Sequence, residues 1–274
     1  MRSVDTAARP VGARRYGPEA LVTLAAPGPA GYVERPSAGR VFPASRRIRL
    51  SDMDATGRLR LDAVARYLQD IATDDVEETG WGSPEHLWVI RSIRVDVLVP
   101  FLADRAVELE TWCSGEAAVA AGRRWSLCGD RGGSIEVDSV WIHLGPDARP
   151  ARLVDFGVYA VAAGGRRVST KLGLPGPPPD APRRAWPLRL SDVDVLGHVN
   201  NAAYWQAVEQ VLRGGGIDPA QPYRASLDFR EPLDLGDDVQ LAPFRDAEAF
   251  AVGFCVGPST RAVARVEQLG PRNP

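Results

Sequence analysis

An internal repeat limits the folds open to this chain more than any other feature of its sequence. Residues 49–57 and 189–197 share the pattern R-L-S-D-x-D-x-x-G at an offset of 140 residues (189 − 49). A second pair of similar segments, 95–101 and 227–233, follows in the same order at an offset of 132 residues (227 − 95). A duplication followed by a small change in loop length gives this pattern, so two related units are predicted.

Each repeat unit continues with the spacing of a helix and then with the alternation of strands. Apolar residues three and four apart run from Leu61 to Val76 before Gly80, and from Ala203 to Leu212 before three glycines. Period-two segments predict strands. These are residues 93–99, 107–111, 135–144, 225–231, 238–243, 249–256 and 261–268. Each unit is therefore predicted to be α+β, with a long helix that buries its apolar face on an antiparallel sheet.

Proline and glycine mark the predicted boundaries of the two units. Residues 1–40 show no lasting period and are predicted to form a flexible N-terminal tail. Residues 172–187 are too rich in proline for a helix or a central strand, which predicts a linker. The first unit then covers residues 41–171 and the second unit residues 188–274.

Composition narrows the possible partners and cofactors. The net charge is −2, which gives no bulk attraction to nucleic acid or to a membrane surface. The three cysteines and three histidines show no metal-ligand spacing. The three scattered thiols suit a reducing cytoplasm. No apolar run reaches the length of a membrane span. We expect a cytoplasmic protein with no metal, no organic cofactor and no stable membrane insertion.

The second RLSD segment leads into a group of side chains that can carry out chemistry. Asp194, His198, Asn200 and Asn201 stand together where the second helix is predicted to begin. A helix N-terminus presents free N–H groups that can stabilise an oxyanion, and a nearby carboxylate can activate water or attack a carbonyl directly. These parts suit acyl hydrolysis. Asp and Asn are also common at turns and helix caps for purely local reasons.

The repeat itself helps to separate the structural residues from the chemical ones. Asp52 and Asp192 occur in both halves and are expected to cap the turn. Asp54 and Asp194 are also duplicated, but only the second is followed by Gly-His-Val-Asn-Asn. Because a cap alone does not need these residues, we predict that Asp194 is catalytic and that its counterpart is structural. His198 is open to either role.

The pattern D-x-D-x-x-G-H-V-N-N-x-x-Y over residues 192–204 resembles the hotdog thioesterases. The duplicated layout over about residues 45–270, together with residues 141–144 and 149–153, resembles the acyl-acyl carrier protein thioesterases of plants and bacteria. The resemblance implies a tandem double hotdog in which the first half binds the acyl chain and the second supplies catalysis. It also implies that Asp194 is the catalytic aspartate and His198 the active-site histidine.

The sequence departs from that family at two places. Plant members place an asparagine two residues after the aspartate, where this chain has Leu196. Plant members also carry a Glu-Cys pair on a later strand, where residues 229–233 contain Glu231 and no cysteine. A cysteine nucleophile is therefore not expected. Glu231 is a candidate for positioning water, beside the simpler interpretation of a surface carboxylate. Asn200 and Asn201 are further candidates for positioning the substrate.

The resemblance predicts hydrolysis of a fatty acyl thioester on acyl carrier protein, with release of free fatty acid in fatty acid biosynthesis and lipid metabolism. The same chemistry on acyl-coenzyme A is one alternative, and a non-catalytic acyl-binding protein is another. An acidic carrier protein favours an arginine-rich rim. Candidates for that rim are Arg123, Arg124, Arg183 and Arg184. The two halves can form a pseudo-dimer, so both a monomer and a homodimer are compatible with the sequence.

Overall fold

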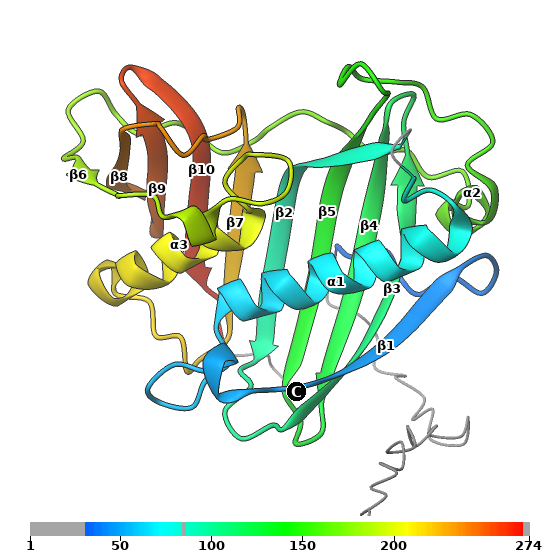
Figure 1. Cartoon of the computed structure of the whole chain (residues 1–274). Helices are drawn as coiled ribbons and strands as arrows, with labels where there is room; N and C mark the ends of the chain where they lie inside the picture. Colours follow the sequence, from blue (N-terminus) through cyan, green and yellow to red (C-terminus); the bar gives the residue numbers. More distant parts are fainter. Residues whose placement is uncertain (1–30, 84–85, 271–274) are drawn as a thin grey trace, which may run out of the picture.

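The computed structural model describes residues 31–83 and 86–270. It consists of one large sheet with two long helices on one face (Figure 1). The first half contains β1 (Val41–Arg47), the short 3-10 turn η1 (Leu50–Asp52), α1 (Leu61–Thr79), β2 (Leu87–Val99), β3 (Ala106–Glu116), β4 (Ala120–Gly129), β5 (Ser134–Leu144) and α2 (Gly157–Ala163). The second half contains β6 (Arg184–Ala185), η2 (Leu190–Asp192), α3 (Asn201–Gly215), β7 (Tyr223–Phe229), β8 (Val239–Asp246), β9 (Ala249–Val256) and β10 (Ser259–Gln268).

The strand order shows that the two halves have the same topology. The sheet runs β1-β3-β4-β5-β2-β7-β10-β9-β8-β6, so the order of the first half returns, reversed, in the second. The halves join where β2 pairs antiparallel with β7, from Ser92 opposite Asp228 to Val97 opposite Tyr223. An antiparallel junction between two copies of one topology relates them by a pseudo-two-fold axis. The duplication predicted from the sequence is therefore present in the fold.

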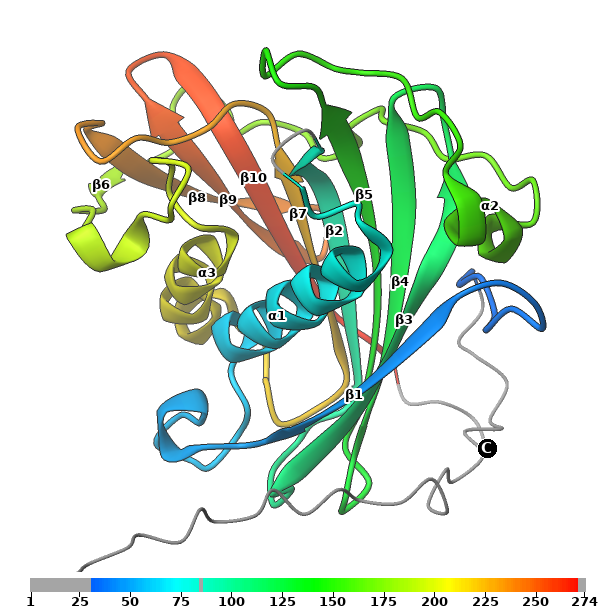
Figure 2. The ribbon, with the colours of Figure 1, turned by 45° about the vertical axis from the view of Figure 1, so that its right-hand side comes forward.

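The two long helices pack against each other and share one core with the sheet. Figure 2 shows the sheet curving around α1, with α3 beside it. Buried side chains of α1, such as Leu68 and Ile71, belong to the same apolar cluster as Val208 and Leu212 of α3. Burial of apolar surface is the main favourable contribution to folding. Because the halves share this cluster, they are expected to fold as one cooperative unit.

The helix ends follow the local chemistry that the sequence predicted. Gly80 ends α1 with φ of +79° and Gly216 ends α3 with φ of +77°, a left-handed conformation that suits glycine. Asn200 caps α3, since its side chain accepts a hydrogen bond from the Ala202 amide at 2.9 Å. By contrast, the N-cap of α1, Arg60, makes no side-chain cap bond. Contacts from elsewhere in the chain therefore complete the start of α1.

Part of the predicted N-terminal tail lies against the first half. Residues 1–30 are outside the described part of the chain. The Tyr32 hydroxyl donates to the Glu136 carbonyl at 3.3 Å, and the Tyr32 ring lies between the guanidinium groups of Arg94 and Arg124, each 4.1 Å from its centroid. Arg40 forms an ion pair with the buried Asp75 of α1 at 2.5 Å. Residues 31–40 therefore pack on the domain that follows them.

The proline-rich segment between the halves is attached to the sheet face opposite the helices. Leu227 and Phe229 of β7 face the core, so Asp228 between them points to the other face. Its carboxylate accepts hydrogen bonds from the amides of Gly173 and Leu174, both at 2.9 Å. The segment includes β6, which pairs with β8.

We expect Asp228→Ala to destabilise the fold by about 2 kcal/mol, because two backbone N–H groups lose their acceptor and a buried site loses its side chain. Urea denaturation measures this as a lower midpoint at an unchanged slope. Asp180→Ala, at an exposed position of the same segment, is the control and should leave the midpoint unchanged. Equal midpoints for the two variants would contradict this role of Asp228.

Candidate active site

The two RLSD loops have nearly identical backbones. In the first, the Asp54 amide donates to the Arg58 carbonyl at 2.8 Å; in the second, the Asp194 amide donates to the His198 carbonyl at 2.9 Å. The glycine before the arginine or histidine has φ of +83° in both loops. Any functional difference between them must therefore come from their side chains.

In the second loop the aspartate keeps one oxygen free of protein donors. Asp194 Oδ1 accepts a hydrogen bond from the Leu196 amide at 2.9 Å. Within residues 31–83 and 86–270, no donor contacts its Oδ2. The side chains of Val195 and Leu196 are exposed beside it. A half-buried carboxylate with a free oxygen can accept a proton from water or attack a carbonyl carbon.

In the first loop the corresponding aspartate is fully occupied. Asp54 accepts hydrogen bonds from the Thr56 amide and hydroxyl at 2.8 and 2.6 Å and from the Arg58 amide at 3.1 Å, and it pairs with the Arg58 guanidinium at 3.2 Å. Burial opposes ionisation of this carboxyl, but the donors outweigh it and hold the pKa of Asp54 below its ordinary value. Asp54 is therefore held as an anion with no oxygen left for substrate.

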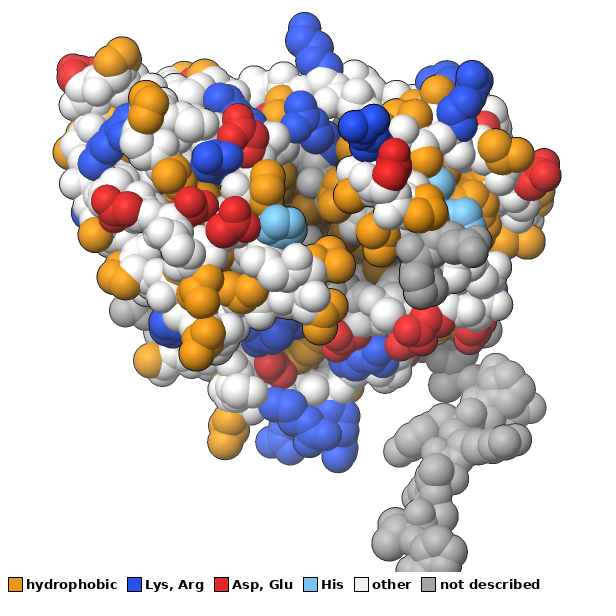
Figure 3. All heavy atoms as spheres, turned by 45° about the horizontal axis from the view of Figure 1, so that its top comes forward, with side chains coloured by type: hydrophobic (Ala, Val, Ile, Leu, Met, Phe, Trp, Pro, Cys, Tyr) orange, Lys and Arg blue, Asp and Glu red, His pale blue; other side chains and the backbone are white. Residues whose placement is uncertain are grey.

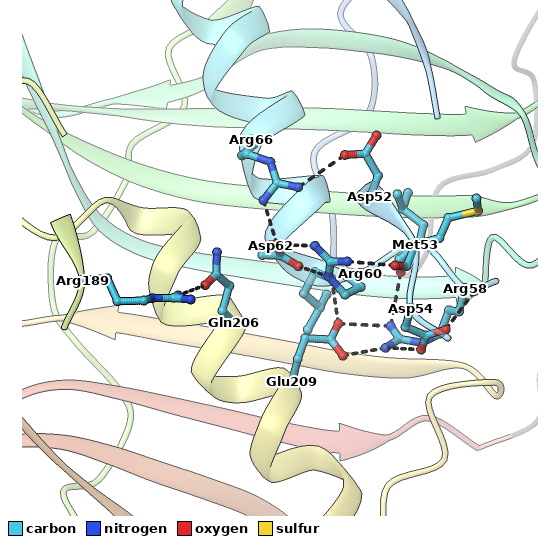
Figure 4. Close-up of polar contacts among 12 residues, drawn as sticks. Asp52, Met53, Asp54, Arg58, Arg60, Asp62, Arg66, Arg189, Gln206 and Glu209 are labelled. Atoms are coloured by element: carbon cyan, nitrogen blue, oxygen red, sulfur yellow. Dashed lines mark hydrogen bonds and ion pairs between the residues drawn. The ribbon is translucent and has the colours of Figure 1, made fainter. Parts of the chain in front are cut away.

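Arg58 closes the first loop from within. Its side chain is 4% exposed and reaches across to Glu209 of α3, with Nη2 to Oε2 at 2.5 Å (Figure 4). Glu209 Oε1 also accepts from the Leu61 amide at 2.8 Å, which completes the start of α1. The Glu209 side chain, from a helix of the second half, thus occupies the position in the first half that corresponds to the candidate site.

His198, which corresponds to Arg58 by the 140-residue offset, turns outward to a different partner. Its Nδ1 lies 2.7 Å from Asp234 Oδ1, and the side chain is 49% exposed. We did not predict Asp234 from the sequence. The 132-residue offset nevertheless aligns it with Leu102, so a carboxylate appears only in the half that carries the histidine. Like His198, Asp234 therefore has no counterpart of the same type in the first half.

The remaining predicted residues occupy different places. Asn200 is the cap of α3 and its side chain is used there. Asn201 is the first residue of α3, and its amide has no hydrogen-bond partner among the residues described. Glu231 forms an ion pair with Arg261 and is not joined to His198. The structure therefore brings Asp194, His198 and the start of α3 together, and it adds Asp234 where we expected Glu231.

Only two of the four arginines proposed for a basic rim are at the surface. Arg123 is paired with Asp75 at 2.6 Å, and Arg124, which is buried, is paired with Glu136 at 2.6 Å. Their place on β4 directs both into ion pairs of the first half, so neither forms a rim. Arg183 and Arg184 are exposed.

Family comparison agrees with the duplicated architecture. A model of the acyl-ACP thioesterase N-terminal domain matches residues 39–160, and a model of the C-terminal domain of that family matches residues 179–254. The chain belongs to the acyl-ACP thioesterase family. This family membership makes it a thioester hydrolase, as the resemblance at residues 192–204 predicted.

Two individual relatives match more than half of this chain. An uncharacterized protein of Mycobacterium tuberculosis is 30% identical over 240 residues, which are 86% of this chain and 96% of that protein. The chloroplastic oleoyl-acyl carrier protein thioesterase 2 of Arabidopsis thaliana is 25% identical over 209 residues, 65% of this chain and 56% of that protein.

Solved structures confirm the predicted double-hotdog α+β fold. An acyl-ACP thioesterase from Bacteroides thetaiotaomicron superposes with a TM-score of 0.67 at 15% identity, over 82% of this chain and 96% of the other. The 12:0-ACP thioesterase from Umbellularia californica superposes with a TM-score of 0.62 at 19% identity, over 83% and 96%. At these identities the likeness concerns the fold. Within the described ranges, no helix is long and apolar enough to cross a membrane.

Proposed function

We propose that this thioester hydrolase cleaves fatty acyl groups from acyl carrier protein at the second RLSD loop and releases free fatty acid. The observation that carries the proposal is the contrast between the two loops. Asp194 has a free oxygen near the His198–Asp234 pair, whereas Asp54 is saturated by donors and covered by Arg58. Of the two described RLSD loops, the second thus has the carboxylate that is open to substrate.

In the proposed reaction, Asp194 Oδ2 removes a proton from water while the water oxygen bonds to the thioester carbonyl carbon. The oxyanion that forms is stabilised by the free N–H at the start of α3. The C–S bond then breaks, and His198 passes the proton that Asp194 took from water to the leaving thiolate, which restores the Asp194 carboxylate. Asp234 accepts a hydrogen bond from the Nδ1–H of the imidazole, which orients Nε2 toward the substrate and stabilises the ring while Nε2 carries the proton. Direct attack by Asp194 with a transient anhydride is the alternative first step.

The carrier-protein partner is supported by exposed positive charge in the segment that leads into the second RLSD loop. Arg183 Nη1 donates a hydrogen bond to the Gly257 carbonyl, in the β9–β10 turn, at 2.6 Å. Arg184 follows it in β6. Figure 3 shows this face of the molecule hollowed near its centre, with hydrophobic, basic and acidic side chains around the hollow. Complementary charge on a rim mainly guides association. We infer that Arg183 and Arg184 favour an acidic carrier protein over free coenzyme A.

The test is thiol release from matched acyl-carrier protein and acyl-coenzyme A substrates, from C8 to C18. We expect faster turnover on carrier protein. Arg183→Ala/Arg184→Ala should raise KM for the carrier substrate about threefold and leave KM for the coenzyme A substrate unchanged. Arg105→Ala/Arg131→Ala, which removes two exposed arginines of the first half, is the charge-matched control. No thiol release from any substrate by folded protein would exclude hydrolysis, while preference for coenzyme A would overturn the choice of carrier protein.

A further inference from the structure

The closed first-half loop shows what kind of side chain reaches each loop from the opposite half. Glu209 comes from α3, eight residues after the helix begins at Asn201, and contacts the start of α1 through the Leu61 amide at 2.8 Å. The same carboxylate holds Arg58. Figure 4 shows Glu209 pointing from α3 toward Arg58. The helix of the second half therefore lies against the start of the helix of the first half.

The repeat identifies the counterpart of Glu209. An offset of 140 residues relates Arg58 to His198 and the first residue of α1 to the first residue of α3. The same offset relates Gln69 to Glu209. Gln69 lies eight residues after α1 begins and is partly buried. The halves share one topology about the β2–β7 junction, and their long helices pack together. We infer from this symmetry that Gln69 faces the start of α3.

The contacts on the two sides of the axis differ in a way that suits a binding site. Glu209 uses both of its oxygens on protein donors, whereas the Gln69 side chain makes no hydrogen bond within the described part of the chain. The Asn201 amide, which corresponds to the Leu61 amide, likewise has no described partner. A carboxylate can only accept hydrogen bonds, but a carboxamide can donate them. The second site thus combines a free amide N–H with a side chain able to donate.

We propose that Gln69 is an oxyanion-binding residue of the second-half site, supplied by the first half. Its carboxamide N–H donates to the thioester carbonyl oxygen together with the Asn201 amide, and both bonds strengthen as negative charge develops on that oxygen. The inference rests on the proposed function of that site. It also explains why one half is open: glutamate at this position occupies the helix start, and glutamine leaves it available for substrate.

The experiment compares Gln69→Glu and Gln69→Ala with the wild-type chain on the best acyl-carrier substrate. Loss of one oxyanion donor lowers kcat by a factor of about 100 or more with little change in KM, and we expect this of both variants. For Gln69→Glu, the ratio of kcat to the wild-type value should rise as pH falls below about 5, because a protonated glutamic acid can donate a hydrogen bond. Gln69→Ala should show no such rise. Asp70→Asn, the exposed neighbour on α1, is the control.

The outcomes separate this inference from the proposed function. An inactive wild-type chain overturns the proposed function. An active wild type with both Gln69 variants within about twofold in kcat overturns the role of Gln69 alone. A loss of activity that appears only in KM, or a Gln69→Glu ratio that does not change with pH, also overturns oxyanion binding. Circular dichroism of each variant verifies that the fold is intact when the kinetics are compared.

Discussion

Asp194→Asn is expected to lower kcat for thioester hydrolysis about a thousandfold, which is the typical size of the effect of losing a general base or nucleophile. The substitution keeps the shape of the side chain, and the Leu196 amide can still donate to the remaining carbonyl oxygen. Only the ability of the free oxygen to take a proton or attack carbon is lost. Thiol release under saturating substrate measures kcat directly, and KM should change little.

Asp54→Asn provides the matched control, because it makes the same change at the same point of the same backbone turn. Among the residues that the structure describes, its oxygens accept hydrogen bonds only from Thr56 and Arg58. Turnover should therefore stay within about twofold of the wild type at a temperature where the variant is folded. Equal losses in the two variants would show that the aspartates act on the fold. A fully active Asp194→Asn variant would remove the second loop from the mechanism.

Arg58→Met should produce the largest loss of stability, about 3 kcal/mol. Removing one partner of a buried ion pair leaves an uncompensated charge behind. Here Glu209, which is mostly buried, and Asp54 both lose their cation. Chemical denaturation at neutral pH measures the difference. Arg46→Met breaks the more exposed pair with Asp74, at 3.0 Å, and should cost less than about 1 kcal/mol.

A double-mutant cycle and a pH series make the Arg58 prediction specific. Glu209→Gln in the Arg58→Met background should recover part of the stability, since a neutral amide can still accept from Leu61. Burial opposes ionisation of Asp54, but the Thr56 donors and, after them, Arg58 hold its pKa below the ordinary value. The share of stability that the Arg58 cation contributes through Asp54 is present above the unfolded pKa, near 4, and is lost as pH falls through the lower folded value. The gap between wild type and Arg58→Met should therefore narrow in acid. A gap that is constant with pH would point to lost packing instead.

The repeat let much of the architecture be predicted from the sequence. Identical turns at a fixed offset predicted two copies of one unit, and the helical spacing from Leu61 and from Ala203 placed both long helices. Gly80 and the glycines after Leu212 marked the helix ends. These features are local, because periodicity and capping depend on residues close together in the chain.

Other features depend on contacts between distant residues, and the sequence did not indicate them. No strand was predicted at β4, because Arg123 and Arg124 interrupt its apolar alternation. Both arginines are paired with acids on neighbouring elements, Asp75 and Glu136. Likewise, nothing in the loop sequence shows that Arg58 reaches Glu209, 151 residues away. A buried cation becomes compatible with a core only once its partner is known.

The antiparallel junction of β2 and β7 joins the two copies of one topology within a single chain. In a symmetric dimer of identical subunits, a substitution in one loop appears in both, so a change that closes one site closes the other. Here the two copies are covalently joined and carry separate residues at every equivalent position. The two sides of the axis can therefore differ: the first loop carries the Arg58–Glu209 ion pair, and the second carries His198 beside Asp234. A single covalent chain thus permits an asymmetry that a symmetric dimer cannot hold.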